Sequence, residues 1–355
     1  MDRRTFRVGI IGLGGMAYAH IRGVQALRDC KITALCDVDA ARLRQAGEEL
    51  GIGSEHLYTD YQALIHDPAV DSIISVTPNQ LHAEVMEACL RAGKPFLSEK
   101  PFTLTYEEAR RVKAAYEKGP VPSMIGFSYR YTPAFRMARR LVQEGRIGNV
   151  RTFFVQYMQG WGSPLYDTPY VWRFDRQASG TGALGDLGSH MIDLAHFIVG
   201  RFQSVSSMME TIVPERRSLD GASMRKVEVD DYASFQARMA SGALGLFQTS
   251  RVAIGSDNQL EITLYGDTGT IRASTVDADH LVWVYRDDRT GQLAELKLRV
   301  GSGDRLSQWE DYLRMLAGTA DETLPDLASG YENQRVIEAV VRSNDARRTV
   351  DLNEV

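Results

Sequence analysis

Residues 8–20 read VGIIGLGGMAYAH, a short apolar run followed by a glycine-rich turn and the start of a helical pattern. Gly12, Gly14 and Ala17 form a GxGxxA pattern between the predicted strand and the predicted helix. Glycines there permit a tight turn and the close approach of a pyrophosphate, and the helix N-terminus supplies N–H donors and a positive dipole end. The stretch predicts a dinucleotide-binding turn, to which Gly15 and Met16 also belong.

An acidic residue follows at the expected distance. Asp37 ends the second predicted strand, in ALCDVD, twenty residues after Ala17. A carboxylate at this place accepts hydrogen bonds from an adenosine ribose and repels a 2′-phosphate, so NAD is favoured over NADP. Arg42 is near enough in sequence to leave NADP open. The alternative interpretation is a close-packed glycine turn beside a surface aspartate, with no cofactor.

Length and composition limit the class of protein. The 355 residues exceed what one hydrophobic core usually supports, which predicts two domains. A net charge of -5 and a pI near 5.9, without a dense Lys/Arg cluster, argue against nucleic acid and anionic membranes as partners. Cys30, Cys36 and Cys89 lack metal-site spacing and cannot all pair, which indicates a reducing compartment and no metal.

The N-terminal stretch also has features of an export signal. Its arginines, apolar run and Ala-x-Ala ending at Ala19 fit such a signal, but cleavage there would destroy the glycine motif. No other stretch approaches the length of a membrane span. We therefore expect a cytoplasmic protein.

The order of strand and helix patterns along the chain predicts an α/β domain followed by an α+β domain. Short apolar runs alternate with helical patterns up to Phe127, which is typical of a doubly wound parallel sheet of the Rossmann type. Residues 128–355 contain runs rich in β-branched and aromatic residues, broken at Gly/Asp turns, which predict an open, mostly antiparallel sheet. Helices around 306–316 and 334–342 are expected to pack on that second sheet, and its exposed face predicts a homodimer or homotetramer.

A second group of polar residues lies where strands of the first domain end. Ligands of such sheets bind beyond the carboxyl ends of the strands. The stretch PFLSEKP places Glu99 and Lys100 at one such end, and Pro101 restricts Lys100 to extended geometry. The stretch VTPNQLH adds further candidates at the same edge: Thr77, Pro78, Asn79 and His82.

The second domain carries ionisable residues at helical spacing. In SGTGALGDLGSHMIDLAHF, Asp186 and His190 lie four residues apart, and Asp193 follows three residues later. This polar stripe contains no lysine, arginine or glutamate and follows a glycine-rich loop. It is typical of a face turned into a cleft, although a solvated polar face is the alternative.

These stretches together resemble the Gfo/Idh/MocA family of oxidoreductases. The resemblance covers both domains and rests on motifs in family order: GLGGMA, SEKPFTLTYEEA, GFSYRYTPAF, RLVQEGRIGNV and GTGALGDLGSHMIDL. Ala17 in place of a third glycine, and Thr181 within the later glycine run, are small departures. The resemblance implies Lys100 as a catalytic lysine, with Asp186 and His190 as its partners.

The family implies an NAD-dependent dehydrogenase that oxidises a secondary hydroxyl of a sugar, sugar derivative or cyclitol. His190 suits a general base because histidine titrates near neutrality, and Lys100 can donate to the reacting oxygen. Further candidates for contacts with a polyhydroxylated substrate, each of which could instead only pack, are Tyr129, Arg130, Trp172 and Arg173. An NAD-requiring glycosidase, a sugar ketoreductase and a non-catalytic sensor remain alternatives.

Overall fold

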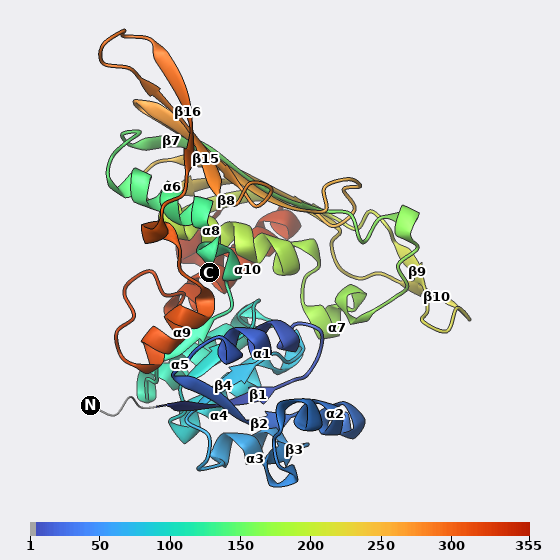
Figure 1. The fold of residues 1–355 in the computed structure, drawn as a ribbon. Coiled ribbons are helices and arrows are strands. Elements are labelled where there is room, and N and C mark those ends of the chain that lie inside the picture. The colour runs from blue at the N-terminus through green and yellow to red at the C-terminus, as the bar shows by residue number, and fades with distance from the viewer. Residues whose placement is uncertain (1–4) are drawn as a thin grey trace. The chain divides into compact units, whose positions relative to one another are not determined.

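A computed structural model describes residues 5–355 of the chain (Figure 1). The chain divides into two compact units. The first ends at Gly126 and also includes Ser307–Glu332, and the second consists of Phe127–Leu306 and Asn333–Val355. Within residues 5–355, none of the helices combines the length and hydrophobicity that crossing a bilayer requires.

The first unit contains a six-stranded parallel sheet in the order β3-β2-β1-β4-β5-β6, which confirms the predicted doubly wound fold. Strand β4 is fully buried, and β1 is buried over its last four residues, as expected where helices cover both faces. Its strands are β1 (Phe6–Ile11), β2 (Cys30–Cys36), β3 (Leu57–Tyr58), β4 (Ser72–Ser75), β5 (Phe96–Ser98) and β6 (Ser123–Ile125). Its helices are α1 (Ala17–Gln25), α2 (Ala40–Leu50), α3 (Tyr61–His66), α4 (His82–Ala92), α5 (Tyr106–Lys118) and α9 (Gln308–Leu316).

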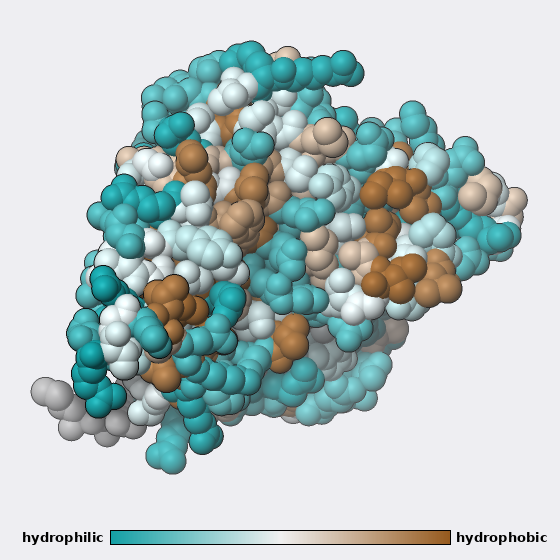
Figure 2. All heavy atoms as spheres, turned by 90° about the horizontal axis from the view of Figure 1, so that it is seen from above, coloured by the Kyte–Doolittle hydropathy of each residue, from teal (hydrophilic) through white to brown (hydrophobic). Residues whose placement is uncertain are grey.

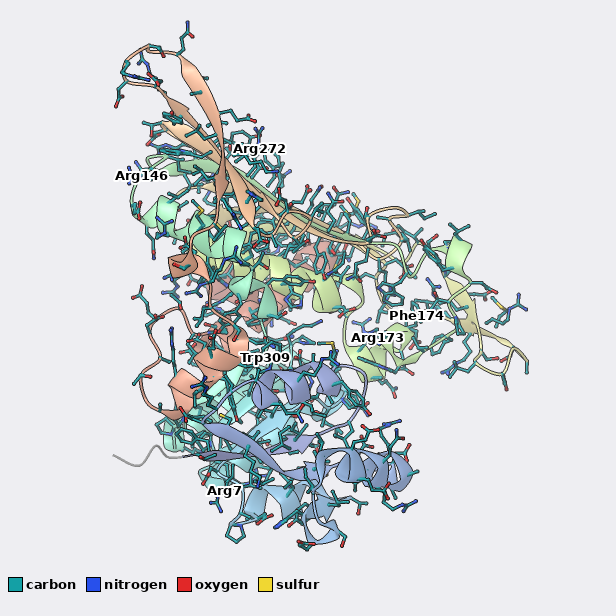
Figure 3. All side chains as sticks on the ribbon, in the orientation of Figure 1. Arg7, Arg146, Arg173, Phe174, Arg272 and Trp309 are labelled. Carbon is teal, nitrogen blue, oxygen red and sulfur yellow. The ribbon has the colours of Figure 1, made fainter. Side chains whose placement is uncertain are left out.

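Helix α9 belongs to the first unit, so the prediction that it packs on the second sheet is wrong. The ring of Trp309, which Figure 3 labels, lies so close to Gly23 of α1 that a Cβ on that glycine would be 2.1 Å from it. The hydroxyl of Tyr312 is 2.6 Å from that of Ser72 on β4. Apolar residues at helical spacing show that one face of a helix is buried, but they do not show against which surface.

The second unit contains a nine-stranded sheet in the order β16-β15-β14-β13-β7-β12-β11-β8-β17. Every neighbouring pair is antiparallel except β7 and β12, which confirms an open, mostly antiparallel sheet. Its strands are β7 (Val150–Gln159), β8 (Phe202–Glu210), β11 (Tyr232–Met239), β12 (Leu244–Ser250), β13 (Asn258–Gly266), β14 (Gly269–Ser274), β15 (His280–Arg286), β16 (Leu293–Arg299) and β17 (Val350–Asp351). A separate hairpin is formed by β9 (Glu215–Arg217) and β10 (Met224–Lys226).

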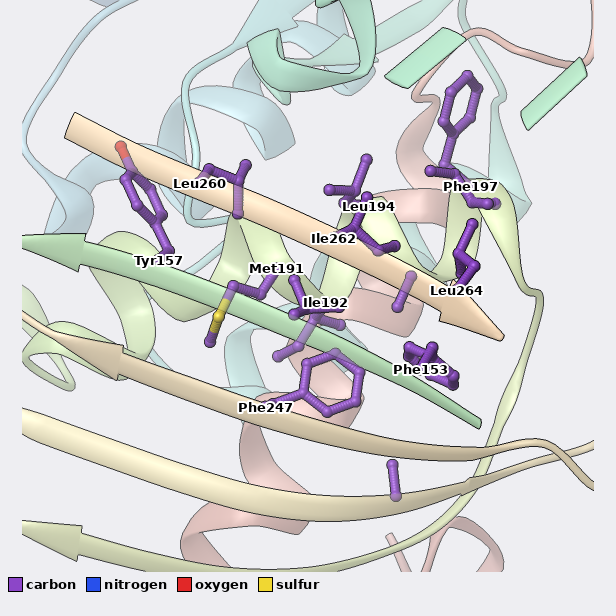
Figure 4. Packing of buried hydrophobic residues seen from close by; sticks show 14 of the residues in the cluster. Phe153, Tyr157, Met191, Ile192, Leu194, Phe197, Phe247, Leu260, Ile262 and Leu264 are labelled. Atoms are coloured by element: carbon purple, nitrogen blue, oxygen red, sulfur yellow. The ribbon is translucent and has the colours of Figure 1, made fainter. Parts of the chain in front are cut away.

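Helices cover one face of this sheet (Figure 1). They are α6 (Pro133–Gln143), α8 (Ser189–Ile198) and the part of α10 (Leu327–Ala346) that follows Glu332, and the short α7 (Arg176–Ser179) lies outside this layer. Inward-facing strand residues such as Phe153 and Phe247 share one core with Met191 and Leu194 of α8 (Figure 4). Val340 of α10 belongs to the same core, which confirms the prediction for residues 334–342.

We predict that Gly23→Ala destabilises the first unit. Alanine in a helix is usually more stable than glycine by about 0.5–1 kcal/mol, but here the new Cβ would overlap the Trp309 ring. Overpacking costs about 1–3 kcal/mol, so the melting temperature should fall. In a Trp309→Leu background, Gly23→Ala should lower the melting temperature less than it does in the unmodified protein, because the obstructing ring is gone. An unchanged melting temperature for Gly23→Ala would show that α9 does not pack here.

Candidate active site

The turn after β1 is closely packed at its first glycine and open at the two glycines that follow. Gly12 has a φ of +88°, and a Cβ there would lie 2.6 Å from the carbonyl oxygen of Val76. Its N–H donates to the carbonyl of Cys36 on β2 at 2.8 Å. A Cβ on Gly14 or Gly15 would meet nothing within 4 Å. The turn therefore leaves its backbone accessible at the point where α1 begins.

This turn fits the pyrophosphate of a dinucleotide. Helix α1 begins at Ala17, and the side chain of the preceding Met16 does not cap it. The first amides of a helix need partners and carry the positive end of the dipole, so they favour an anion. Gly14, Gly15, Met16 and Ala17 form the turn between β1 and α1 that the sequence predicted, and their contact with the cofactor stays a prediction.

Asp37 sits at the end of β2 beside this turn. One carboxylate oxygen accepts the N–H of Leu13 at 2.7 Å, and the other accepts the N–H of Asp39 at 2.8 Å. The guanidinium of Arg42 approaches Asp37 Oδ2 to 3.4 Å. Each carboxylate oxygen has two lone pairs, so Asp37 retains acceptor capacity for a ribose diol while it fixes the turn.

The segment after β4 contributes Thr77, Pro78 and Asn79 to the same edge of the sheet, but His82 does not present its ring there. His82 is buried, with Nδ1 2.7 Å from the carbonyl of Pro101 and Nε2 3.0 Å from the carbonyl of Thr77. Burial lowers the pKa of His82. The prediction of a cofactor-binding His82 side chain is wrong, because both ring nitrogens contact the protein backbone.

Glu99, also predicted to bind the cofactor, makes two contacts within the protein. Its Oε1 is 2.8 Å from Nε2 of His20, and its Oε2 accepts the backbone N–H of Lys100 at 3.2 Å. Burial alone would raise the pKa of Glu99, but the hydrogen bond from His20 and the charge of Lys100 outweigh it and hold this pKa below its ordinary value. Lys100 comes after β5 and is half-buried. Its peptide bond to Pro101 is cis.

In the second unit, Asp186 and His190 lie on consecutive turns of different geometry. Asp186 lies in the π-helical turn η6 (Leu184–Gly188), and His190 lies in the first turn of α8. Such π turns occur often at functional sites. The side chain of Asp186 is 31% exposed, and its Oδ2 is 3.9 Å from Nε of Arg173. The sequence predicted the helix but not the π turn.

Aromatic side chains surround His190. Its ring is buried and meets Tyr129 edge to face at a centroid distance of 4.6 Å, with Tyr157 at 6.0 Å and Phe127 at 6.5 Å. The hydroxyls of Tyr129 and Tyr157 are 2.7 Å apart. Asn258 completes the group, since it accepts from Tyr157 at 2.6 Å and its amide contacts Tyr129 at 2.7 Å.

Sequence reasoning identified Tyr129 but missed Tyr157 and Asn258. Tyr157 occupies an inward-facing position of β7, where the alternation predicts only a core residue. Burial, with Tyr129 and Asp186 nearby, raises the pKa of Tyr157, so its hydroxyl stays protonated. Only the polar tip of an inward-facing tyrosine signals such a role.

Arg130 is a structural residue, which corrects its assignment as a substrate contact. It is buried, and its Nε donates to both carboxylate oxygens of Asp193 at 2.8 and 2.9 Å. Nη2 is 2.7 Å from the same carboxylate. A buried guanidinium needs such a partner. Trp172 is 38% exposed and Arg173 stacks on it at 4.5 Å, so these two residues stay candidates.

Two buried arginines support the loop that carries Trp172 and Arg173. Arg251 pairs with Asp231 at 2.7 Å and donates to the carbonyl of Arg173 at 3.1 Å. Arg251 and Arg216 both lie over the ring of Phe174, at 4.5 and 4.1 Å. Figure 3 labels Arg173 and Phe174 on this loop. The candidate substrate residues are therefore attached to a buried group of charged and aromatic side chains.

Two family models divide the chain between them. One, described as an oxidoreductase family with an NAD-binding Rossmann fold, matches residues 6–127, and the other, a GFO/IDH/MocA C-terminal domain, matches residues 135–272. This chain belongs to the Gfo/Idh/MocA family of oxidoreductases. As in other Gfo/Idh/MocA oxidoreductases, the first unit is an NAD-binding domain, which confirms the predicted cofactor.

Other members of the Gfo/Idh/MocA family match almost the whole chain. Levoglucosan dehydrogenase of Pseudarthrobacter phenanthrenivorans is 28% identical over 99% of both chains, and myo-inositol 2-dehydrogenase of Thermotoga maritima is 27% identical over 98% of this chain and 99% of its own. The structure of levoglucosan dehydrogenase with NADH and L-sorbose has a TM-score of 0.91 at 28% identity, over 98% of this chain and 99% of that one. An oxidoreductase domain protein from Kribbella flavida has a TM-score of 0.89 at 32% identity, over 98% and 99%.

We predict that Asp37 sets the preference for NAD over NADP. The unmodified protein should bind NADH clearly more tightly than NADPH, and Asp37→Ser should narrow the difference. The substitution removes the charge that repels a 2′-phosphate and leaves Arg42, now 3.4 Å from Asp37, available to pair with it. Fluorescence titration with both nucleotides measures the change.

The matched control is Asp37→Ser combined with Arg42→Ala. It should lose the NADPH affinity that the single variant gained, because no cation replaces Arg42. Equal affinities for the two nucleotides in the unmodified protein would contradict the role of Asp37.

Proposed function

We propose that this chain is an NAD-dependent dehydrogenase that oxidises a secondary hydroxyl of a sugar, sugar derivative or cyclitol to a ketone. The observation that carries the proposal is the arrangement of the second unit. There His190 packs against the rings of Tyr129 and Tyr157 and follows Asp186 by four residues. Levoglucosan and myo-inositol, after which two relatives are named, are both polyhydroxylated rings.

The reaction requires that a hydroxyl loses its proton while the hydrogen on the same carbon leaves as hydride. Bound NAD supplies the hydride acceptor. In our proposal His190 takes the hydroxyl proton, because an imidazole is a base near neutral pH. Lys100 donates a hydrogen bond to the same oxygen as negative charge develops on it. Asp186 binds a neighbouring hydroxyl or orients the other two side chains.

Exposed polar and aromatic groups of the second unit support a polyhydroxylated substrate. Tyr129 is half-buried and Asn258 is exposed, so a hydroxyl and an amide are available to hydroxyl groups of a ring. Trp172 is partly exposed, and an indole face packs well on the C–H face of a sugar. The carboxylate of Asp186 beside Arg173 supplies both an acceptor and donors.

We also propose that the second unit associates with its copy. Its sheet face opposite the helices exposes apolar side chains that pair across strands, including Phe154 beside Tyr265 and Leu246 opposite Phe154. Phe154, Leu244 and Leu246 are 44–46% exposed. Figure 2 shows brown side chains among teal ones on this view of the molecule. Apolar pairs of this kind on a sheet face are typical of protein interfaces, and a dimer or tetramer is the simplest closed assembly.

We place the protein in the cytoplasm. Cys30, Cys36 and Cys89 are free and buried. Burial raises the pKa of Cys30 to about 11 and those of Cys36 and Cys89 to about 12, so these thiols stay protonated and unreactive. A chain with free structural thiols suits a reducing compartment.

We predict that Lys100→Met and His190→Ala each lower turnover by roughly a hundredfold or more, the usual effect of losing an electrostatic or general-base group. NAD affinity should barely move. Higher pH should partly restore the turnover of His190→Ala, since hydroxide can replace the base. It should not restore the turnover of Lys100→Met. The measurements are pH–rate profiles on a substrate found by screening inositols, aldoses and sugar phosphates for NADH absorbance, with NAD titration beside them. Near-normal turnover in either variant would contradict these roles.

Sedimentation velocity at micromolar concentration tests the association. We predict a dimer or tetramer, and Leu246→Arg should shift it toward monomer because it places a charge in the apolar face. Leu165→Arg is the matched control, since Leu165 is 68% exposed but lies outside the sheet. A monomeric unmodified protein would refute the proposed association.

A further inference from the structure

His20 is a fully buried histidine that none of the proposed chemistry uses. It lies on α1, and its Nε2 is 2.8 Å from Oε1 of Glu99. Its Nδ1 is buried and has no hydrogen-bond partner within residues 5–355. The ring meets Trp309 edge to face at 6.2 Å. The contact with Glu99 is thus the polar interaction that justifies a histidine here, because an apolar side chain could pack against Trp309 equally well.

The Glu99 carboxylate occupies a space that the fold leaves for it. A Cβ on Gly126 would lie 3.0 Å from the carboxyl carbon of Glu99. With one oxygen held by His20, the other accepts the N–H of Lys100. His20 from α1, Lys100 from the same turn and His82 from α4 are the charged or titratable groups that face this carboxylate.

We propose that His20 is a positioning residue for Lys100: by holding the Glu99 carboxylate, it fixes the main chain of Lys100. The inference rests on the proposed function, in which Lys100 contacts the reacting oxygen. Because His20 lies on α1, the same bond connects Lys100 to the helix whose N-terminus fits the cofactor.

Chemical labelling of Lys100 tests the inference without substrate or cofactor. Replacing the Glu99 carboxylate by an amide removes the charge-assisted hydrogen bond with His20. The main chain of Lys100 should then be held less firmly, and its half-buried amine should be exposed more often. With limiting acetic anhydride at pH 8, Glu99→Gln should raise the acetylation of Lys100 at least threefold relative to the exposed Lys226, as measured by peptide mass spectrometry.

Two replacements of His20 form a matched pair. The amide nitrogen of a glutamine reaches about as far as Nε2 of a histidine, whereas that of an asparagine ends near Nδ1. Lys100 should therefore be acetylated no faster in His20→Gln than in the unmodified protein. In His20→Asn its acetylation should rise as much as in Glu99→Gln. Equal labelling of the two His20 variants, or unchanged labelling in Glu99→Gln, would overturn the inference.

Turnover provides the second readout. His20→Asn should lower kcat roughly tenfold to a hundredfold, since small misplacements of a reacting group have large effects, with KM and NAD affinity changed less than threefold. His20→Gln should restore kcat, because its amide can still hold Glu99. In a Lys100→Met background, His20→Asn should cause no further loss, because the residue it positions is absent.

Gly23→Ala separates positioning from packing. It disturbs the contact of α1 with Trp309 but leaves the bond between His20 and Glu99 in place. If Gly23→Ala lowers kcat as much as His20→Asn at an equal loss of melting temperature, His20 is merely structural. Normal turnover in Lys100→Met would instead refute the proposed function, whereas an inactive Lys100→Met with normal turnover and labelling in His20→Asn would refute this inference alone.

Discussion

An ionised carboxylate that leaves water needs hydrogen-bond donors in exchange, and in both units backbone amides of the site loops supply them. Asp37 accepts the N–H of Leu13, and Glu99 accepts that of Lys100. In the second unit, Asp230 accepts two amides at the start of the π turn, each at 2.7 Å. Hydrogen bonds to charged groups contribute about 1.5–3 kcal/mol each, and a buried charge left without them costs more. These carboxylates therefore fix loop segments of the site that lie outside the strand hydrogen bonds.

The parts of the fold that the sequence predicted are those that few residue types can form. A φ of +88° beside the carbonyl of Val76 admits only glycine at position 12. An acid at the end of the second strand, Asp37, and apolar runs at regular intervals completed the pattern of a Rossmann sheet. These signals are local, because each depends on a turn, a strand or a helix and not on its distant neighbours.

The predictions that failed depended on partners far away in sequence. The spacing of α9 indicated a buried face but not that Gly23 receives Trp309. Arg130 finds its carboxylate 63 residues away, and no pattern around either residue announces the pair. The edge strand β3 was not predicted for a different reason, because its two residues are too few to show a period. The π turn that contains Asp186 could not be predicted either. It covers only five residues, and no residue type in it distinguishes a π turn from an α-helical turn.

Three buried histidines illustrate how structure separates roles that sequence cannot. Both ring nitrogens of His82 face carbonyl oxygens, and Nε2 of His20 faces a carboxylate, so these two rings connect segments of the first unit. His190 packs against Tyr129 and other aromatic rings. Aromatic contacts of this kind orient an imidazole without committing a proton, whereas hydrogen bonds to fixed acceptors do commit one. The printed hydrogen bonds therefore assign His82 and His20 to positioning segments of the first unit, although neither helix shows from its sequence that its histidine has this role.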